Sequence, residues 1–421
     1  MRLKFLGACG EIGRSGILVE NGGAESGHTP REGRLVLDYG IKPTTPPEFP
    51  LPVEAGSVVV SHAHLDHSGT VPNLSDMRPV VYMTPPTLDV AHMLVRDTLK
   101  VSKKRGVDPP FRREDVQRFR EIARIVPYRK PFPAAGTEVT LYSANHIPGS
   151  AATHVNGHRT LLYTGDITST PTRLVPDTET KYPEADVLIM ECTYFGTDHK
   201  ARFDLELEFV ESVLQTLEEG GHAVIPCFGV ARWQEMLLVL ENYGIHPWVD
   251  GMGFDIARMF LNHPAYARAK ELRAALEKAR RVEPEERARV LDEPAAVITT
   301  AGMMEGGPVL YYVQKLKDHE KSRIFLTGYQ IQGTNGRKAV EGGYIDVRGE
   351  TVPLKMGVSL FNFSSHSGDS QLKELAKGFV DRGTRKIFAV HGEKCAGFAE
   401  WARAELGVEA EAPARGEEFE I

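Results

Sequence analysis

The chain of 421 residues has few cysteines, no long apolar run and no excess of positive charge. Its four cysteines form no C-x-x-C pair and no regular spacing, so we expect free thiols in a reducing cytoplasm rather than a secreted disulfide framework. No apolar run approaches the roughly 20 residues that cross a bilayer. The first residues, MRLKFLGACGEIGRSG, lack the apolar stretch of a signal peptide, so we expect none.

The composition is that of a large globular protein, with 41% hydrophobic and 25% charged residues. In the first 70 residues, short apolar runs separated by glycine predict β-strands, among them RLKFLG, SGILVE, RLVLDYG and SVVVSH. Helical spacing follows at 87–101 and 112–123, and strands return before about residue 200. From about residue 200 to 350, helical and strand patterns alternate, which favours a mostly parallel sheet with helices on its faces. Since no Ser-rich linker separates the two parts, we expect the second to be inserted into the first.

The motif SHAHLDHSG follows the apolar strand VVV and contains His62, His64, Asp66 and His67. Imidazole and carboxylate are ligands suited to zinc, and their spacing on a strand-to-helix turn can aim them at two adjacent points. A single histidine in a core is commonly structural. Three within six positions, at the end of a strand, predict a metal site.

Four to six protein ligands suit a pair of metal ions better than one catalytic zinc ion, and such a pair needs a carboxylate between the ions. Candidates for the missing ligands follow other apolar strands: His146 in SANHIPGS, Asp166 in YTGD and His391 in AVHGE. Each alone could be an ordinary turn or surface residue. Their shared position after strands makes them a set, because strand-end loops commonly carry the chemistry of α/β proteins.

Together these motifs resemble the metallo-β-lactamase superfamily. Within it, MECTY, IPCFGVARWQE, TTAGMMEGGP, FNFSSHSGD and AVHGEK resemble the β-CASP ribonucleases, closest to the archaeal cleavage and polyadenylation specificity factor type without a KH extension. The resemblance covers nearly the whole chain. It implies an α/β fold, a metallo-β-lactamase αββα sandwich with an inserted β-CASP domain whose parallel sheet is flanked by helices. The expected domains are 1–197 and 351–421 for the core and 198–350 for the insertion.

The resemblance also implies two zinc ions per chain, held by seven residues: His62, His64, Asp66, His67, His146, Asp166 and His391. Three histidines (62, 64 and 146) would hold one ion. Asp66, His67 and His391 would hold the other, and Asp166 would bridge the two ions. A pair of zinc ions activates water and neutralises phosphate charge, so Asp66 and Asp166 would also be catalytic.

Three further residues match family motifs. Asp38 in LVLDYG matches a carboxylate that orients a metal ligand, and the alternative is a turn aspartate at a strand end. Glu191 in ECTY and His366 in SSHSGD match an acidic and a histidine motif. We expect His366, held by Glu191, to act as the general acid for the leaving oxygen. The alternative for His366 is a polar residue that caps the following helix.

The resemblance implies a zinc-dependent ribonuclease that hydrolyses phosphodiester bonds of single-stranded RNA in RNA processing or decay, as an endonuclease, a 5′→3′ exonuclease or both. SSHSGD is more similar to the polyadenylation-factor form than to the SGHA form of the RNase J branch, which favours an endonuclease. The alternatives are a small-molecule metallo-hydrolase, a DNA nuclease of the same superfamily and a non-catalytic scaffold subunit. The inserted domain opposes the first, and the seven intact candidate ligands oppose the last. A homodimer and an RNA-processing complex both stay open.

The net charge of −7 excludes a protein that holds nucleic acid by overall basicity. Residues 96–130, however, contain 12 Lys or Arg against 5 Asp or Glu, so this segment carries +7 and the rest of the chain −14. The segment is either a solvated helical surface or a basic face for RNA. The candidate RNA contacts are Lys103, Lys104 and Arg105 in this segment, Arg232 in GVARWQE, and Ser364 and Ser365 in FNFSSHS.

Overall fold

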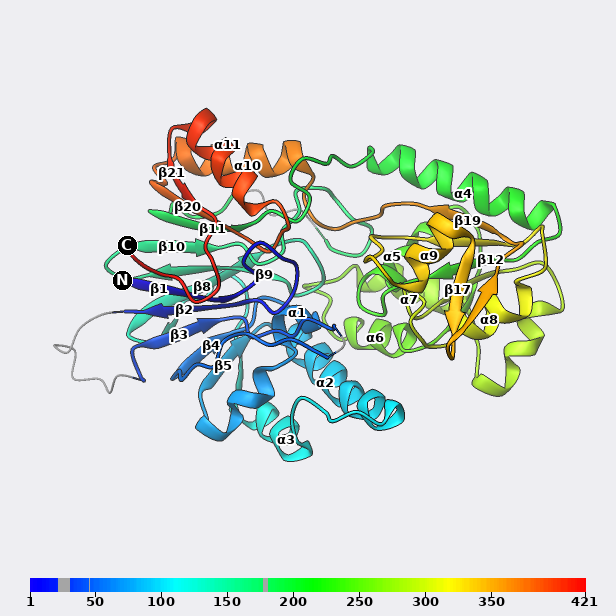
Figure 1. Ribbon diagram of the computed structural model, residues 1–421, viewed down its shortest axis with the longest axis horizontal. Coiled ribbons are helices and arrows are strands. Elements are labelled where there is room, and N and C mark those ends of the chain that lie inside the picture. Colours follow the sequence, from blue (N-terminus) through cyan, green and yellow to red (C-terminus); the bar gives the residue numbers. More distant parts are fainter. Residues whose placement is uncertain (22–30, 45, 177–180) are drawn as a thin grey trace. The chain divides into compact units, whose positions relative to one another are not determined.

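The computed structural model describes residues 1–21, 31–44, 46–176 and 181–421, without the side chain of Arg105. The chain forms two compact units (Figure 1). Unit 1 comprises Met1–Pro171, Asp177–Asp198 and Ser365–Ile421, and unit 2 comprises Thr172–Pro176 and His199–Ser364. Among the described residues, no helix is long and apolar enough to cross a membrane.

Unit 1 contains two seven-stranded sheets. In spatial order, the first sheet is formed by β22 (Glu418–Glu420), β1 (Arg2–Gly7), β2 (Gly16–Glu20), β3 (Arg34–Leu37), β4 (Ser57–Val59), β5 (Val80–Met83) and β6 (Ala123–Ile125). The second is formed by β21 (Glu409–Glu411), β20 (Lys386–Val390), β11 (Val187–Glu191), β10 (Thr160–Tyr163), β9 (Ala151–Asn156), β8 (Thr137–Ser143) and β7 (Phe132–Ala134).

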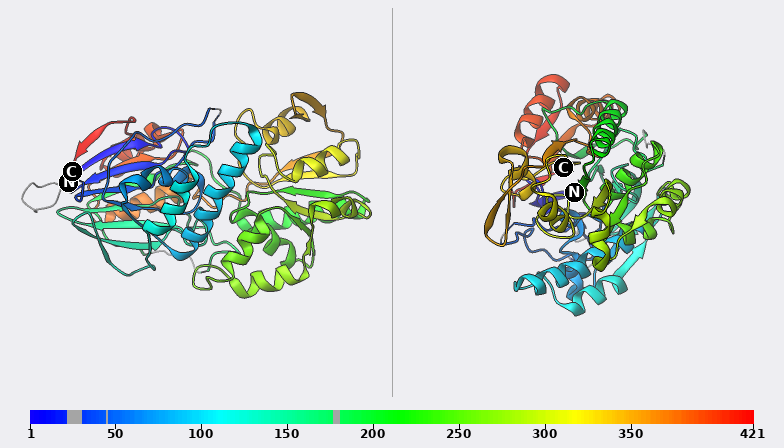
Figure 2. Two further views of the ribbon diagram at one scale, coloured as in Figure 1. Left: turned by 90° about the horizontal axis from the view of Figure 1, so that it is seen from below. Right: turned by 90° about the vertical axis from the view of Figure 1, so that its right-hand side faces the viewer.

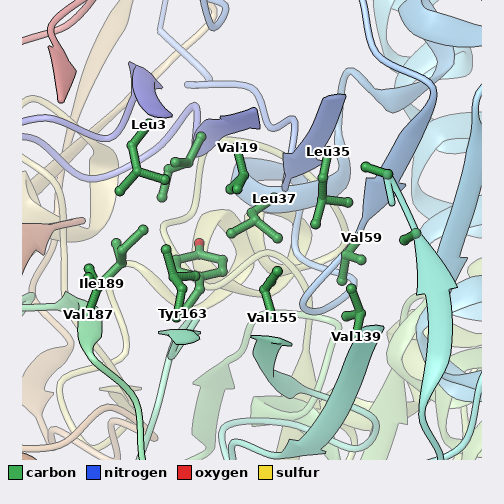
Figure 3. Close-up of a cluster of buried hydrophobic side chains, with 14 of the residues drawn as sticks. Leu3, Val19, Leu35, Leu37, Val59, Val139, Val155, Tyr163, Val187 and Ile189 are labelled. Atoms are coloured by element: carbon green, nitrogen blue, oxygen red, sulfur yellow. The ribbon is translucent and has the colours of Figure 1, made fainter. Parts of the chain in front are cut away.

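The two sheets pack face to face through a shared apolar core (Figure 3). Leu3, Val19 and Leu37 come from the first sheet, and Val155 and Ile189 from the second. Alternate residues of a strand point to opposite faces, so the short β-branched runs of both sheets can fill this layer. Each such side chain that is fully buried stabilises the fold by roughly 1.5–3 kcal/mol, which holds the strand ends in place.

Helices cover the outer faces of both sheets (Figure 2). The helices of unit 1 are α1 (Leu65–Ser68), the 3-10 helix η1 (Val71–Met77), α2 (Pro85–Arg105), α3 (Arg113–Ile122), α10 (Asp369–Asp381) and α11 (Cys395–Leu406). Phe379 of α10 and Phe398 of α11 pack with Leu188 and Ile387 in a second core behind the second sheet. The order of layers is helix, sheet, sheet, helix, so the αββα prediction is confirmed.

Unit 2 is built on a six-stranded sheet whose neighbouring strands all pair in parallel. In spatial order it contains β14 (Arg280–Arg281), β13 (Trp248–Asp250), β15 (Ala296–Thr299), β12 (Ala223–Pro226), β16 (Arg323–Leu326) and β19 (Gly357–Leu360). Its helices are α4 (Arg202–Glu218), α5 (Arg232–Asn242), α6 (Gly253–Phe260), α7 (Ala269–Lys278), η2 (Pro284–Leu291), α8 (Val309–Leu316) and α9 (Asn335–Gly342). A hairpin of β17 (Tyr344–Val347) and β18 (Glu350–Pro353) completes the unit. The expected parallel sheet with helices is confirmed.

Candidate metal centre

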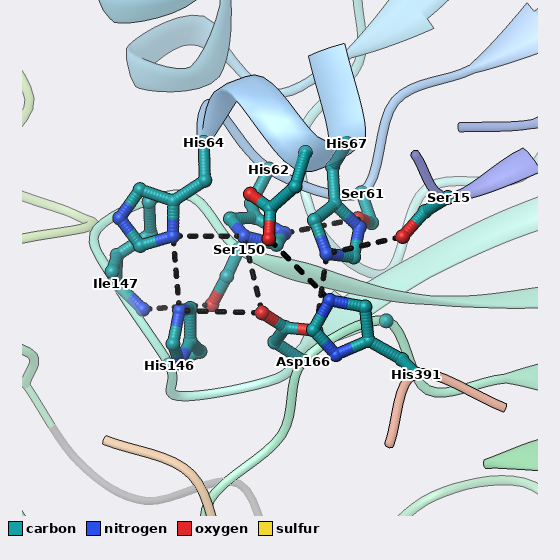
Figure 4. A network of polar contacts seen from close by, with 12 residues as sticks. Ser15, Ser61, His62, His64, His67, His146, Ile147, Ser150, Asp166 and His391 are labelled. Carbon is teal, nitrogen blue, oxygen red and sulfur yellow. Dashed lines mark hydrogen bonds and ion pairs between the residues drawn. The ribbon is translucent and has the colours of Figure 1, made fainter. Parts of the chain in front are cut away.

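The seven candidate ligands lie together at strand ends of unit 1 (Figure 4). His62 and His64 follow β4, and Asp66 and His67 lie on the short helix α1. The other three follow β8, β10 and β20: His146, Asp166 and His391. The backbone after β3 passes very close to α1, because a Cβ on Gly40 would stand only 1.7 Å from the carbonyl oxygen of Asp66. A glycine is therefore required there to keep α1 in position.

The first group of ligand atoms belongs to His62, His64, His146 and Asp166, and these atoms all lie within 4.8 Å of one another. Nδ1 of His64 lies 3.1 Å from Nε2 of His62 and 3.2 Å from Nε2 of His146. Oδ2 of Asp166 lies 3.6 Å from each of the latter two nitrogens. Burial lowers the pKa of all three histidines, which keeps their imidazoles in the neutral form that ligates metals.

The second group comprises Asp66, His67 and His391. Nε2 of His391 lies 3.4 Å from Oδ2 of Asp66. Oδ1 of Asp166 lies 3.1 Å from Nε2 of His67 and 3.4 Å from Nδ1 of His391. Asp166 therefore directs one carboxylate oxygen toward each group. Apart from these two imidazole nitrogens, its buried Oδ1 has no hydrogen-bond partner within the described part of the chain, which leaves a lone pair for a cation.

The charges of this second group favour a bound cation. Burial opposes ionisation of Asp166, but the neighbouring His391 and His67 hold the pKa of its carboxyl well below the usual range. Burial likewise opposes protonation of His67, yet the carboxylates of Asp166 and Asp38 raise its pKa. Negative charge at the centre is thus balanced by protons on imidazoles, and a metal ion can take their place.

Asp38 lies directly behind His67. Its Oδ2 accepts hydrogen bonds from Nδ1 of His67, Oη of Tyr163 and Oγ of Ser61, each at 2.7 Å. Its Oδ1 accepts one from the backbone N–H of Ser61 at 2.6 Å. These donors fix the fully buried carboxylate of Asp38. Because this carboxylate holds Nδ1 of His67, the other ring nitrogen, Nε2, points toward Asp166.

Glu191 and His366 form a pair next to the first ligand group. Nδ1 of His366 donates to Oε1 of Glu191 at 2.7 Å, and its Nε2 lies 3.7 Å from Oδ2 of Asp166. The backbone N–H groups of Ile167 and Thr193 also donate to Glu191. Burial opposes protonation of His366, but the carboxylates of Glu191 and Asp166 outweigh it and raise its pKa to about 9.

The other candidate residues lie apart from one another along the chain. Lys103 and Lys104 are exposed at the end of α2, and the side chain of Arg105 lies outside the described part. Arg232 begins α5 in unit 2. Ser364 ends unit 2, whereas the carbonyl of Ser365 in unit 1 accepts a hydrogen bond from Nδ1 of His146 at 2.8 Å.

Part of the positive charge in segment 96–130 is compensated locally. The guanidinium of Arg112 lies 2.8 Å from a carboxylate oxygen of Asp76 and 2.9 Å from one of Asp115. Arg118 also pairs with both of these carboxylates. Because Asp76 lies outside the segment, its contribution could not be counted from the sequence window.

Sequence reasoning missed several residues that support the ligands. Ser61 and Tyr163 hold Asp38, and Thr193 Oγ1 lies 3.1 Å from Nδ1 of His391. Ser61 and Thr193 stand beside motif residues, in SHAH and ECTY, so adjacency is the signal that could have found them. Tyr163 precedes TGD, and only the tertiary fold brings it to Asp38.

Three family models match successive parts of the chain. A β-lactamase superfamily domain matches residues 38–226, a β-CASP domain matches 233–338, and a Zn-dependent metallo-hydrolase RNA specificity domain matches 351–413. By structure, the chain is similar to a protein of unknown function from Enterococcus faecalis V583, with a TM-score of 0.64, 14% identity and 99% of each chain covered. At that identity the likeness concerns the fold alone.

Curated relatives align with nearly the whole chain. RNase aCSPSF2 of Saccharolobus solfataricus is 34% identical over 434 residues, which cover 100% of this chain and 85% of that protein. A probable RNase, MJ4, of Methanocaldococcus jannaschii is 32% identical over 448 residues, which cover 100% of this chain and 100% of that protein. The transcription termination factor FttA of the same organism is 33% identical over 96% of this chain and 69% of its own length. The chain therefore belongs to the β-CASP family of Zn-dependent metallo-hydrolases within the metallo-β-lactamase superfamily, in company with archaeal RNases.

Proposed function

We propose that the protein is a zinc-dependent ribonuclease that cleaves phosphodiester bonds of single-stranded RNA, as an endonuclease, a 5′→3′ exonuclease or both. The observation that carries this proposal is the convergence of two ligand groups on the two oxygens of Asp166. Two relatives that align over the whole chain, RNase aCSPSF2 and the probable RNase MJ4, support the substrate class.

The donor atoms suit zinc, because they are imidazole nitrogens and carboxylate oxygens in a buried site with an unbonded carboxylate oxygen. One ion would be held by His62, His64 and His146, the other by Asp66, His67 and His391, with Asp166 between them. When bound, two such ions supply positive charge for phosphate oxygens and lower the pKa of water enough for attack at neutral pH.

His366 has the position and protonation of a general acid. Its Nδ1 proton is held by Glu191, so its Nε2 proton faces the ligand groups, where the leaving 3′ oxygen would be released. Burial opposes protonation of His366, but the carboxylate of Glu191 raises its pKa and so favours retention of this proton at neutral pH. Glu191 also accepts hydrogen bonds from two backbone N–H groups, so its carboxylate is held in place. It therefore fixes the imidazole ring of His366 and acts as a positioning residue.

The test is cleavage of one single-stranded RNA labelled separately at its 5′ and 3′ ends, with and without a chelator. Internal fragments identify an endonuclease, and mononucleotides released from the 5′ end identify an exonuclease. A DNA oligonucleotide of the same sequence tests for a DNA nuclease. No cleavage of either substrate by the zinc-loaded protein would overturn the proposal and favour a scaffold subunit.

His366→Ala tests the general acid, with His246→Ala as control because His246 lies in unit 2 and pairs with Glu241. We expect His366→Ala to retain zinc and lose most turnover, while His246→Ala keeps both. Full turnover of His366→Ala with intact zinc content would refute the assignment.

We propose domain boundaries of 1–197 and 351–421 for the metallo-β-lactamase core and 198–350 for the inserted β-CASP domain. The RNA specificity match starts at residue 351, while compact unit 2 extends to Ser364. We also propose Lys103, Lys104, Arg105, Arg232, Ser364 and Ser365 as RNA contacts. Four free cysteines support action in the reducing cytoplasm, and a homodimer or an RNA-processing complex is the proposed assembly.

A further inference from the structure

Two exposed aromatic side chains follow neighbouring parallel strands of unit 2. Phe228 follows β12 and is 40% exposed, and Tyr329 follows β16 and is 45% exposed. Because β12 and β16 pair in parallel, both residues leave the sheet at its carboxyl edge. We call Phe228 and Tyr329 the aromatic pair. In open parallel sheets, this edge is where ligands bind.

The ring of Phe228 is held against bare backbone. A Cβ on Gly302 would stand 3.3 Å from Cδ2 of the ring and 2.8 Å from the backbone nitrogen of Phe228, and one on Gly328 would stand 3.9 Å from Cε2. Nε2 of the buried Gln330 donates to the carbonyls of Gly302 and Gly328, at 3.3 and 3.0 Å. This amide ties the loops after β15 and β16 together around an aromatic ring that remains partly open to solvent.

Positive charge accompanies the aromatic pair at this edge. Arg202 lies 5.3 Å from the ring centroid of Phe363, which follows β19, and donates to the carbonyl of Ser364. Its Nε is buried and has no hydrogen bond to any residue that the structure describes. Arg232 begins α5 four residues after Phe228, and its charge acts on the thiol of Cys227 at the end of β12. Aromatic rings beside cations are the combination that binds single-stranded nucleic acids.

We propose that Phe228 and Tyr329 form a stacking site for unpaired nucleobases of RNA, with Arg202 and Arg232 beside the phosphates. This inference rests on the proposed function, since it takes RNA as the substrate, and it gives a reason for a preference for single strands. Paired bases inside a duplex expose no free face, whereas every unpaired base does. A ring fixed in advance also loses little conformational freedom when a base stacks on it.

The test measures binding of two ten-nucleotide RNAs to the full chain, one with bases and one abasic with the same phosphates. All proteins carry His366→Ala and zinc, and gels confirm that the RNA stays intact. We expect Phe228→Ala and Tyr329→Ala each to weaken binding of the base-bearing RNA about 10-fold and to leave abasic RNA unchanged. Phe228→Leu should lose as much as Phe228→Ala, because it keeps an apolar side chain without a π face, whereas Phe228→Tyr should bind like the parent.

Leu214→Ala is the matched control, because Leu214 is 39% exposed and lies twelve residues, about 18 Å, along α4 from Arg202. Thermal unfolding checks that each variant folds. Unchanged binding by Phe228→Ala, or equal loss for both RNAs, would overturn the stacking site while leaving the ribonuclease proposal intact. Loss of self-association with unchanged RNA affinity would instead assign the surface to a second copy of the chain. If the parent binds neither RNA, the proposed function fails, and the stacking site fails with it.

Discussion

The candidate metal centre and the aromatic pair both lie at strand ends, but they are held by different forces. At the centre, Asp38 and His62 are fully buried, and hydrogen bonds fix the side chains in one arrangement. At the aromatic pair, Phe228 and Tyr329 keep 40% and 45% of their surface exposed. There, the ring of Phe228 rests against the backbone of Gly302 and Gly328, and the side-chain amide of Gln330 holds these two residues together.

This difference follows from what each region would do. Hydrolysis needs charges placed within a fraction of an ångström, and buried polar groups remain in place only when each has its partners. Recognition of varied bases needs open rings, because stacking requires a face and no particular hydrogen-bond pattern. Substitutions at the centre should therefore affect metal binding and stability together, whereas substitutions at the pair should affect RNA affinity alone. Four predictions test this contrast, in order of decreasing effect.

Asp166→Asn should have the largest effect. The amide keeps the size of the side chain but removes the charge that both ligand groups face, at 3.1–3.6 Å. Since partners outside the ligand shell already contribute 10–100-fold to metal affinity, we expect turnover to fall by more than about 100-fold. Zinc content by mass spectrometry and cleavage of labelled RNA measure it, with the exposed Asp381→Asn as control. Normal zinc content and turnover would contradict the proposed bridging role.

Asp38→Asn should lower zinc affinity by about 10–100-fold, because His67 loses the carboxylate that orients it. Tyr163→Phe removes only one of the donors to that carboxylate and should cost about 1 kcal/mol of stability with a smaller loss of zinc. Chelator competition gives the affinities. If zinc affinity falls more in Tyr163→Phe than in Asp38→Asn, the carboxylate of Asp38 does not orient His67 for the metal.

The sequence predicted the centre better than its surroundings, for a physical reason. His62, His64, Asp66 and His67 share one turn, so their proximity is fixed by local geometry. The ends of parallel strands meet at one edge of a sheet, so His146, Asp166 and His391 were predictable as a set from their positions after strands. The parallel sheet of unit 2 was also predictable, because helical and strand patterns alternate along residues 200–350, whereas the αββα layers of unit 1 were expected from the family resemblance.

Contacts between distant segments could not be predicted. The carbonyl of Ser365 orients His146 across 219 positions, and Asp76 neutralises Arg112 from outside the counted segment. Phe228 packs against two glycines of other loops, Gly302 and Gly328, and its position at the surface could not be read from its apolar sequence context.

Gln330→Leu should have an intermediate effect, because it changes both the stability of the loops and the binding of RNA at the aromatic pair. It removes the donor to two carbonyls, so we expect a loss of about 1–3 kcal/mol in the free energy of unfolding. The ring of Phe228 then loses its fixed support, and binding of base-bearing RNA should weaken about 3-fold, on the order of half a hydrogen bond's contribution. Abasic RNA should bind as before. If stability falls and RNA binding does not change, the amide supports only the loops, and the ring of Phe228 needs no fixed support to stack.

The smallest effect on the fold and on zinc binding is expected for Lys103→Glu with Lys104→Glu, which separates charge from both stacking and chemistry. These exposed lysines end α2, and if they contact phosphates, each contributes about 0.7 to the slope of log affinity against log salt concentration for a single strand. The double variant should therefore flatten the slope by at least about 1.4, with zinc content unchanged. Lys270→Glu with Arg273→Glu on α7 is the matched control, because both cations are exposed and lie outside the segment 96–130. If the two double variants have equal slopes, the lysines of α2 form a solvated surface, and the positive charge that RNA meets must come from elsewhere, with Arg202 and Arg232 the next to test.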